Sequence, residues 1–122
     1  MADRSVLLVE DEPLILMDLE FAVTDRGWQP RTASGVRKAM EFLEKDAAIA
    51  AAVLDITLKN GENCLPIARE LERRRIPYVL HSGELEHYSA DMDDLTGERV
   101  AKPASAASVV AKALAGLAGD AG

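Results

Sequence analysis

The stretch Ile49-Ala50-Ala51-Ala52-Val53-Leu54-Asp55 is an apolar run that ends in an acid. A continuous apolar run of this length predicts a strand covered on both faces, as in a parallel sheet. Asp55 then opens a loop that contains Gly61. A carboxylate at the end of a buried strand has little structural purpose, so Asp55 is the first candidate functional residue of this chain.

Three other strand-like runs also end in polar residues. Residues 6–9 are followed by Glu10 and Asp11, residues 78–80 by His81 and Ser82, and residues 99–101 by Lys102. The carboxyl ends of parallel strands meet at one edge of the sheet, and open α/β sheets bind ligands at that edge. The sequence therefore predicts acids, a hydroxyl and an amine close together in space.

Strand-like and helix-like segments alternate along the whole chain. The predicted strands cover residues 6–9, 30–33, 49–54, 76–81 and 98–101. The predicted helices begin at Pro13 and after Ser34, and cover roughly 65–74, 84–97 and 103–117. Five strands alternating with five helices predict an α/β fold built from right-handed, parallel βαβ units.

Two of these helices carry local signals. Ser34 is expected to cap the second helix, because a serine hydroxyl can accept a hydrogen bond from a free backbone N–H of the first turn. The first helix has apolar residues at spacings that predict a core-facing side. They are Leu14, Met17, Leu19, Phe21 and Ala22.

Composition and charge limit the class of protein. We expect residues 1–122 to form one domain, without an output domain, because a chain of 122 residues is typical of one domain and shows no linker. The net charge of −7 argues against direct nucleic-acid binding. Cys64 is the sole cysteine, which favours a reducing compartment. No apolar stretch predicts a membrane span or a signal peptide, so we expect a cytoplasmic protein.

The polar residues at the predicted sheet edge suit phosphoryl chemistry. Glu10, Asp11 and Asp55 place three carboxylates together, which is electrostatically costly unless a cation lies among them. Hard oxygen ligands of this kind favour Mg²⁺. Lys102 and Ser82 add an ammonium group and a hydroxyl that could stabilise a phosphoryl group. Asp55 is the candidate nucleophile, since carboxylates form acyl phosphates.

Four motifs in this order resemble the response-regulator receiver domain of two-component signalling. They are Val9-Glu10-Asp11-Glu12-Pro13, Val53-Leu54-Asp55-Ile56, His81-Ser82-Gly83 and Ala101-Lys102-Pro103. The resemblance covers the whole chain. It implies a flavodoxin-like, doubly wound (βα)5 fold with a five-stranded parallel sheet of order 2-1-3-4-5.

The resemblance also assigns roles to the residues of the site. Asp55 would accept a phosphoryl group from a sensor histidine kinase or a histidine phosphotransfer protein, in a Mg²⁺-dependent reaction. Glu10, Asp11 and Asp55, together with the backbone carbonyl of Thr57, would hold the metal. Lys102 would contact the phosphoryl group.

The remaining implied roles concern signalling. Ser82 would be the hydroxyl that switches conformation, while Thr57 and Glu84 would tune the lifetime of the acyl phosphate. The resemblance implies a stand-alone phosphoacceptor with intrinsic phosphotransfer and autodephosphorylation chemistry, not an enzyme. It would signal by contact with an unidentified downstream protein or by onward phosphotransfer.

Residues 56–62 and 77–83 look similar to an atypical receiver subgroup in alphaproteobacteria, whose members often lack the switch aromatic. The chain also departs from the usual receiver pattern at two positions. The first acid is Glu10, where aspartate is more common. Receivers usually carry an aromatic switch residue in the last strand, but residues 98–101 include none, and Val100 lies two residues before Lys102. The normal aromatic relay is therefore not expected.

Two alternative functions follow from the same residues. A pseudo-receiver would use this fold as a binding module without phosphorylation, and the missing aromatic favours it. An aspartyl-nucleophile phosphatase would share a nucleophile such as Asp55, but it requires a second acid at the position that Thr57 occupies.

Overall fold

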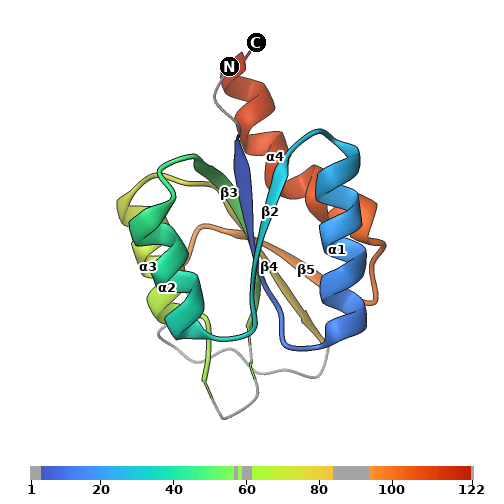
Figure 1. Cartoon of the computed structure of the whole chain (residues 1–122), viewed down its shortest axis with the longest axis horizontal. Coiled ribbons are helices and arrows are strands. Elements are labelled where there is room, and N and C mark those ends of the chain that lie inside the picture. Colours follow the sequence, from blue (N-terminus) through green and yellow to red (C-terminus); the bar gives the residue numbers. More distant parts are fainter. Residues whose placement is uncertain (1–3, 57, 59–61, 84–93, 122) are drawn as a thin grey trace.

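A computed structural model describes residues 4–56, 58, 62–83 and 94–121. These residues form a parallel five-stranded sheet with the order β2-β1-β3-β4-β5, flanked by helices on both faces (Figure 1). The strands are β1 (Ser5–Val9), β2 (Gln29–Ala33), β3 (Ile49–Asp55), β4 (Tyr78–Gly83) and β5 (Glu98–Lys102). The helices are α1 (Pro13–Asp25), α2 (Val36–Lys45), α3 (Leu65–Arg73) and α4 (Ala106–Ala121). The predicted fold class and strand order are confirmed.

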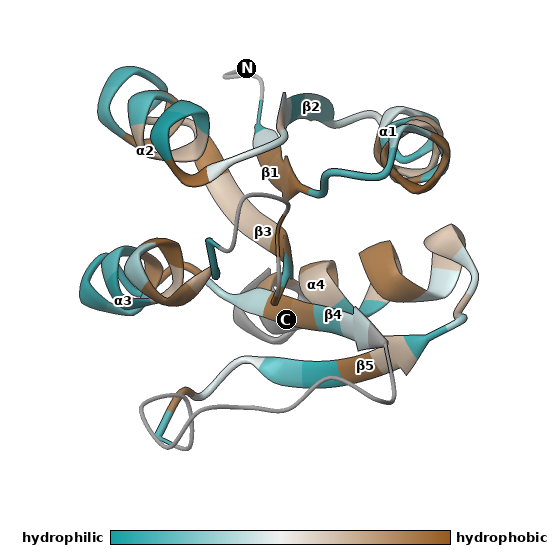
Figure 2. Ribbon diagram, turned by 90° about the horizontal axis from the view of Figure 1, so that it is seen from below, coloured by the Kyte–Doolittle hydropathy of each residue, from teal (hydrophilic) through white to brown (hydrophobic). Residues whose placement is uncertain are grey.

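The sheet separates two apolar layers, because successive side chains of a strand point to opposite faces. On one face, Leu7, Ala52, Leu54 and Leu80 pack with residues of α2 and α3. On the other face, Val6, Leu8, Val53, Val79 and Val100 pack with residues of α1 and α4. Figure 2 shows the hydrophobic strands between these two pairs of helices. The central strands β1 and β3 are therefore covered on both sides, as their apolar sequences predict.

The orientation of α1 differs from the prediction. Pro13 lies in its first turn, and Leu19 is buried, as expected. However, Leu14, Met17 and Phe21 are 73%, 43% and 61% exposed. The helix is apolar around most of its circumference, so the sequence pattern did not distinguish the side that packs against the sheet from the side that faces solvent.

The start of α2 also corrects a prediction. Gly35, not Ser34, is the N-cap residue, and no side chain of that position caps the helix. The backbone N–H of Val36 instead donates a hydrogen bond to Oε1 of Glu62, at 3.3 Å. A carboxylate from the connection before α3 therefore takes the role that was assigned to a local serine.

Two further predictions concern a helix at residues 84–97 and a membrane-spanning segment. The marginal helix predicted at 84–97 falls mostly on residues 84–93, which are not among the described residues. Leu95, which belongs to the same prediction, is buried in the core on the α2–α3 face. Within the described part of the chain, no helix combines the length and the apolar character needed to cross a membrane.

Candidate functional site

The carboxyl ends of four strands bring the predicted site residues to one edge of the sheet. In the register of β3 and β4, Asp55 lies opposite His81, and in that of β4 and β5, Gly83 lies opposite Lys102. Glu10 directly follows β1. The edge therefore collects side chains from segments that are far apart in the sequence.

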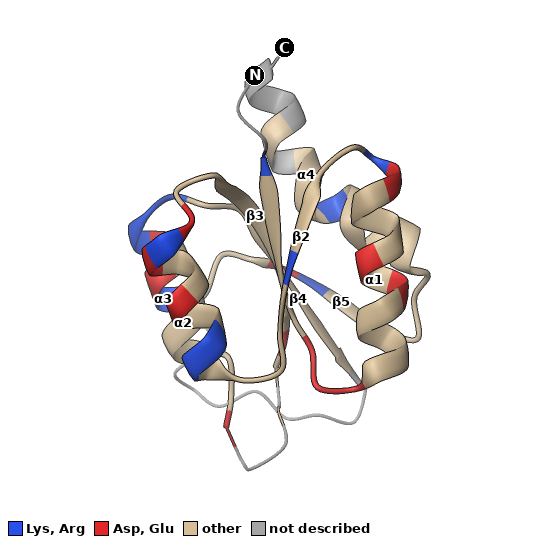
Figure 3. Ribbon diagram, in the orientation of Figure 1, with Lys and Arg blue, Asp and Glu red and all other residues tan. Residues whose placement is uncertain are grey.

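Three carboxylates converge at this edge. Glu10, Asp11 and Asp55 each contribute one oxygen to a group whose members all lie within 4.8 Å of one another. Glu10 and Asp55 are 1% and 2% exposed, and Asp11 is half-buried. Figure 3 shows the acidic connection between β1 and α1 at this end of the sheet. Buried like charges at this separation are unfavourable, so the arrangement favours a bound cation.

The backbone holds the first of these carboxylates in place. The N–H of Glu12 donates a hydrogen bond of 3.1 Å to Oε2 of Glu10. Its other oxygen, Oε1, faces the cluster and lies 3.2 Å from the Nζ atom of Lys102. The longer side chain of glutamate thus bridges the acid cluster and the last strand.

Lys102 supplies positive charge to the cluster. Its Nζ atom lies 3.5 Å from Oδ2 of Asp55, in addition to its contact with Glu10. Burial favours the neutral amine, but the charge of Asp55, followed by that of Glu10, outweighs it and raises the pKa of Lys102 above its usual value. Lys102 is therefore an ammonium group at neutral pH, and within the described part of the chain its one positive charge lies beside three carboxylates.

The donor set fits a hard divalent cation. Carboxylate oxygens are the ligands that Mg²⁺ prefers, and it uses only a few of them because it retains waters. Glu10, Asp11 and Asp55 would hold the ion, and the excess of negative charge over Lys102 is of the sign that such an ion would balance. The residues present therefore fit the metal that the sequence predicts.

Ser82 reaches the same edge from β4. It is 2% exposed and lies opposite Ala101 in the register with β5, one step before the pair formed by Gly83 and Lys102. The predicted hydroxyl is therefore buried near the strand ends. Val100, by contrast, packs in the core on the α1–α4 face and is 9% exposed.

Two predicted site residues cannot be placed. Thr57, including its backbone carbonyl, and Glu84 lie outside the described residues. Their roles as a metal ligand and as modulators of acyl-phosphate lifetime therefore stay predictions.

Two features of the edge were missed by sequence reasoning. One is the direct contact between Glu10 and Lys102, and the other is the position of His81 beside a cavity. Strand alternation offered a signal for the second feature. His81 lies two residues after buried Val79, so it points to the same covered face of the sheet.

Comparisons with known proteins agree with this fold. No protein-family model matches the sequence. The solution structure of SdrG from Sphingomonas melonis Fr1 is 36% identical, covers 97% of this chain and 99% of its own, and superposes with a TM-score of 0.77. The crystal structure of a response regulator receiver protein from Sinorhizobium medicae WSM419 is 27% identical, covers 91% of each chain and has a TM-score of 0.76.

A curated relative is similar over part of its length. The photosynthetic apparatus regulatory protein RegA of Rhodobacter capsulatus is 38% identical over 74 residues, which cover 61% of this chain but only 39% of RegA. The strand order, the acid cluster beside Lys102 and these similarities lead to one conclusion. The chain belongs to the response-regulator receiver domain family of two-component signalling proteins.

Proposed function

We propose that this receiver accepts a phosphoryl group on Asp55 from a phosphohistidine of a sensor kinase or a histidine phosphotransfer protein. The single observation that carries the proposal is the position of the Asp55 carboxylate, which lies in the acid cluster and 3.5 Å from the Lys102 ammonium. An acid nucleophile, a site for a divalent cation and a fixed positive charge are the parts that phosphoryl transfer requires.

The transfer exchanges one bond for another. A carboxylate oxygen of Asp55 attacks phosphorus, an oxygen–phosphorus bond forms, and the nitrogen–phosphorus bond of the donor histidine breaks. The histidine ring retains the electron pair of that bond. When bound, Mg²⁺ supplies positive charge to the phosphoryl oxygens. Glu10 and Asp11 would hold it, and the Thr57 carbonyl is the further predicted ligand.

Lys102 and Ser82 act on the product. The ammonium group of Lys102 is already within reach of Asp55, so it can pair with a phosphoryl oxygen without a large rearrangement. Ser82 can donate a hydrogen bond from its hydroxyl as its loop moves toward the acyl phosphate. Water later hydrolyses the acyl phosphate, at a rate that Thr57 and Glu84 would tune.

The output is proposed to pass through protein contact or onward phosphotransfer. Receiver-domain relatives are signalling proteins, and RegA is described as a regulatory protein. The cytoplasm is the compartment in which kinase phosphodonors and Mg²⁺ would meet this chain. The downstream partner is therefore expected to be a protein that distinguishes the phosphorylated from the unphosphorylated surface.

Phosphoryl uptake from acetyl phosphate tests this proposal. Intact-protein mass spectrometry should show the addition of one phosphoryl group in the presence of Mg²⁺, and no addition in EDTA. Asp55→Asn should abolish uptake while retaining the circular dichroism spectrum of the native protein. The matched control is Asp25→Asn, because Asp25 is an exposed acid at the far end of α1. Uptake by Asp55→Asn at the rate of the unmodified protein would contradict the proposal.

A second candidate function is a binding module that acts without phosphorylation. Val100 favours it, because this residue is packed in the core and the described β5 strand has no aromatic side chain that could change position. A folded protein that takes up no phosphoryl group, with Mg²⁺ and acetyl phosphate both present, would support this second function.

A further inference from the structure

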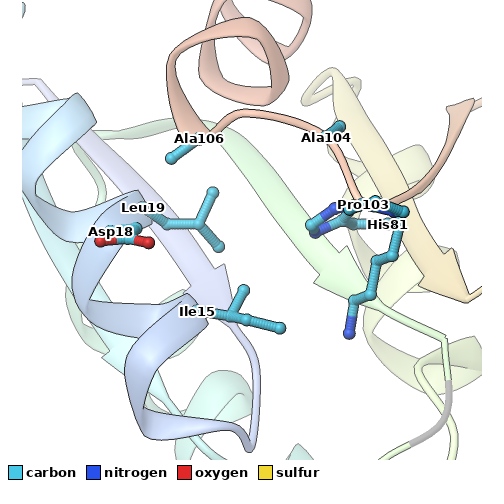
Figure 4. Close-up of a pocket in the computed structure, with 8 residues that line it drawn as sticks. Ile15, Asp18, Leu19, His81, Pro103, Ala104 and Ala106 are labelled. Atoms are coloured by element: carbon cyan, nitrogen blue, oxygen red, sulfur yellow. The ribbon is translucent and has the colours of Figure 1, made fainter.

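A cavity of about 150 Å³ lies between α1 and the connection from β5 to α4 (Figure 4). Its apolar walls come from both sides of this gap: Ile15 and Leu19 from α1, and Pro103, Ala104 and Ala106 from the connection and the start of α4. Asp18, Lys102 and His81 complete the lining. The described lining of the cavity includes none of the three carboxylates, and it includes Lys102, which also contacts Glu10 and Asp55.

His81 is the unusual member of this lining. Its side chain faces Ile15 and Leu19 across the cavity (Figure 4), and the residue is 3% exposed. Among the described residues, neither ring nitrogen has a hydrogen-bond partner. Polar atoms buried to this degree are normally hydrogen-bonded, because leaving them unpaired is costly. The imidazole therefore offers binding capacity toward the cavity.

The ring is uncharged at neutral pH. Burial, and then the nearby charge of Lys102, lowers the pKa of His81 to about 4. A neutral imidazole has one N–H donor and one acceptor nitrogen, so it can hydrogen-bond a hydroxyl in either direction.

The charges around the cavity select an uncharged occupant. Lys102 would repel a cation, while its own charge is already directed to Glu10 and Asp55. Asp18 places a carboxylate in the lining, which disfavours an anion. A cavity of about 150 Å³ can hold one benzene-sized ring. Size, polarity and charge together point to a ring-sized neutral molecule with one polar group.

We propose that this cavity is a binding pocket for a small uncharged molecule with an apolar body and one hydroxyl-type group, which His81 anchors. The proposal goes beyond phosphorylation of Asp55 and does not depend on it. It can be tested on the full chain without Mg²⁺ or a phosphodonor, so its failure and a failure of phosphoryl uptake are separate results.

Phenol and benzene are the matched probes, since they differ by one hydroxyl group. In ¹H–¹⁵N NMR titrations, both should shift the amides of Ile15, Leu19, His81 and Ala104 in a saturable manner. Phenol should bind about two- to tenfold more tightly, the ratio expected from one hydrogen bond. His81→Leu should leave benzene binding in place and remove the advantage of phenol.

A cavity-filling variant provides an independent test. Ala106→Leu should weaken binding of both probes, because the added carbons occupy the cavity. Ala107→Leu is the matched control, since Ala107 is the next residue of α4, is exposed and does not line the cavity. It should bind both probes as the unmodified protein does. If Ala106→Leu fails to fold, the comparison of phenol with benzene in His81→Leu still decides the question.

Three results would overturn the proposal. The first is equal affinity for phenol and benzene in the unmodified protein. The second is amide shifts that are not saturable or that lie away from the cavity, as expected if water alone forms hydrogen bonds with His81. The third is phenol binding that Ala106→Leu leaves unchanged in a folded protein.

Discussion

The two ends of the parallel sheet carry polar clusters of opposite character. Near the amino ends of β1 and β3, the carboxylate of Asp46 accepts hydrogen bonds of 2.8 Å from Oγ of Ser5 and of 2.8 Å from Nε of Arg31. It also accepts one of 2.9 Å from the N–H of Ala48. At this end, one carboxylate faces one guanidinium and each of its oxygens has a donor.

The carboxyl end is not balanced in this way. There, among the residues that the structure describes, Glu10, Asp11 and Asp55 converge near the ammonium group of Lys102, which contacts Glu10 and Asp55. The difference separates a cluster that stabilises the fold from one that is suited to bind. A cluster that contains its own counter-charge needs no ligand, whereas a cluster with excess negative charge is suited to a cation.

The largest expected effect is a loss of stability at low pH. It should arise at the carboxyl end of the sheet, where His81 lies opposite Asp55. The pKa of His81 is about 4 in the folded protein, below its usual value of 6.5, because the ring is buried and near Lys102. The unfolded chain therefore takes up this proton first, and stability falls as the pH falls from about 6.5 to 4. The loss should reach about 3 kcal/mol, since one pKa unit corresponds to about 1.4 kcal/mol.

Urea unfolding at pH 7 and pH 4.5 can measure this loss. His81→Leu should lose less stability than the unmodified protein between these two values, by about 2.5 kcal/mol. Protonation of carboxylates lowers the stability of both proteins at pH 4.5. The difference between their losses in free energy of unfolding therefore reports on the histidine alone. Equal losses in both proteins would show that folding does not lower the pKa of His81.

Removal of the Asp46 carboxylate, which is paired with Arg31, should have the next largest effect on stability. Burial works to raise the pKa of Asp46, but hydrogen bonds from the Ala48 N–H and then Ser5 outweigh it and lower that pKa. Asp46→Ala leaves Ser5 and Arg31 without this acceptor, so the free energy of unfolding at pH 7 should fall by about 2 kcal/mol. Urea denaturation measures the change, and a loss close to zero would mean that this cluster does not stabilise the fold.

Removal of the Asp11 carboxylate, at the carboxyl end of the sheet, should have a smaller effect on stability, and of the opposite sign. In EDTA, Asp11→Asn relieves repulsion by Glu10 and Asp55, so stability should rise by about 0.5 to 1 kcal/mol. Mg²⁺ should stabilise the unmodified protein through binding to the folded state, and this gain should be much smaller in the variant. Thermal unfolding with and without Mg²⁺ tests both statements. A variant that is less stable in EDTA would contradict the unbalanced character of this end.

Much of the sheet and of its polar edge was predictable from the sequence. The run that ends in Asp55 predicts a doubly covered strand, and β3 has that burial. Parallel strands end at a shared edge, so the acids after β1, Asp55 at the end of β3 and Lys102 at the end of β5 are expected to meet there. The convergence of Glu10, Asp11, Asp55 and Lys102 therefore follows from strand ends alone.

The features that were not predicted depend on contacts between distant segments. Exposure of Leu14 and Phe21 depends on which side of an apolar helix packs against the sheet. Gly35, not Ser34, is the N-cap residue of α2, and Glu62, from another connection, accepts a hydrogen bond from the N–H of Val36. The cavity beside His81 depends on the space left between two elements, which a local sequence pattern does not encode.

The most direct test of the contrast between the two ends is binding of beryllofluoride, a mimic of the acyl phosphate, with Mg²⁺ in ¹H–¹⁵N NMR. We predict saturable shifts of the amides of Asp55, Ser82 and Lys102 that require Mg²⁺ and vanish in Asp55→Asn. The amides of Ser5 and Arg31 should stay in place. A folded protein with no shift at the carboxyl end, or with the same shifts in Asp55→Asn, would contradict the assignment of this edge as the phosphoryl site.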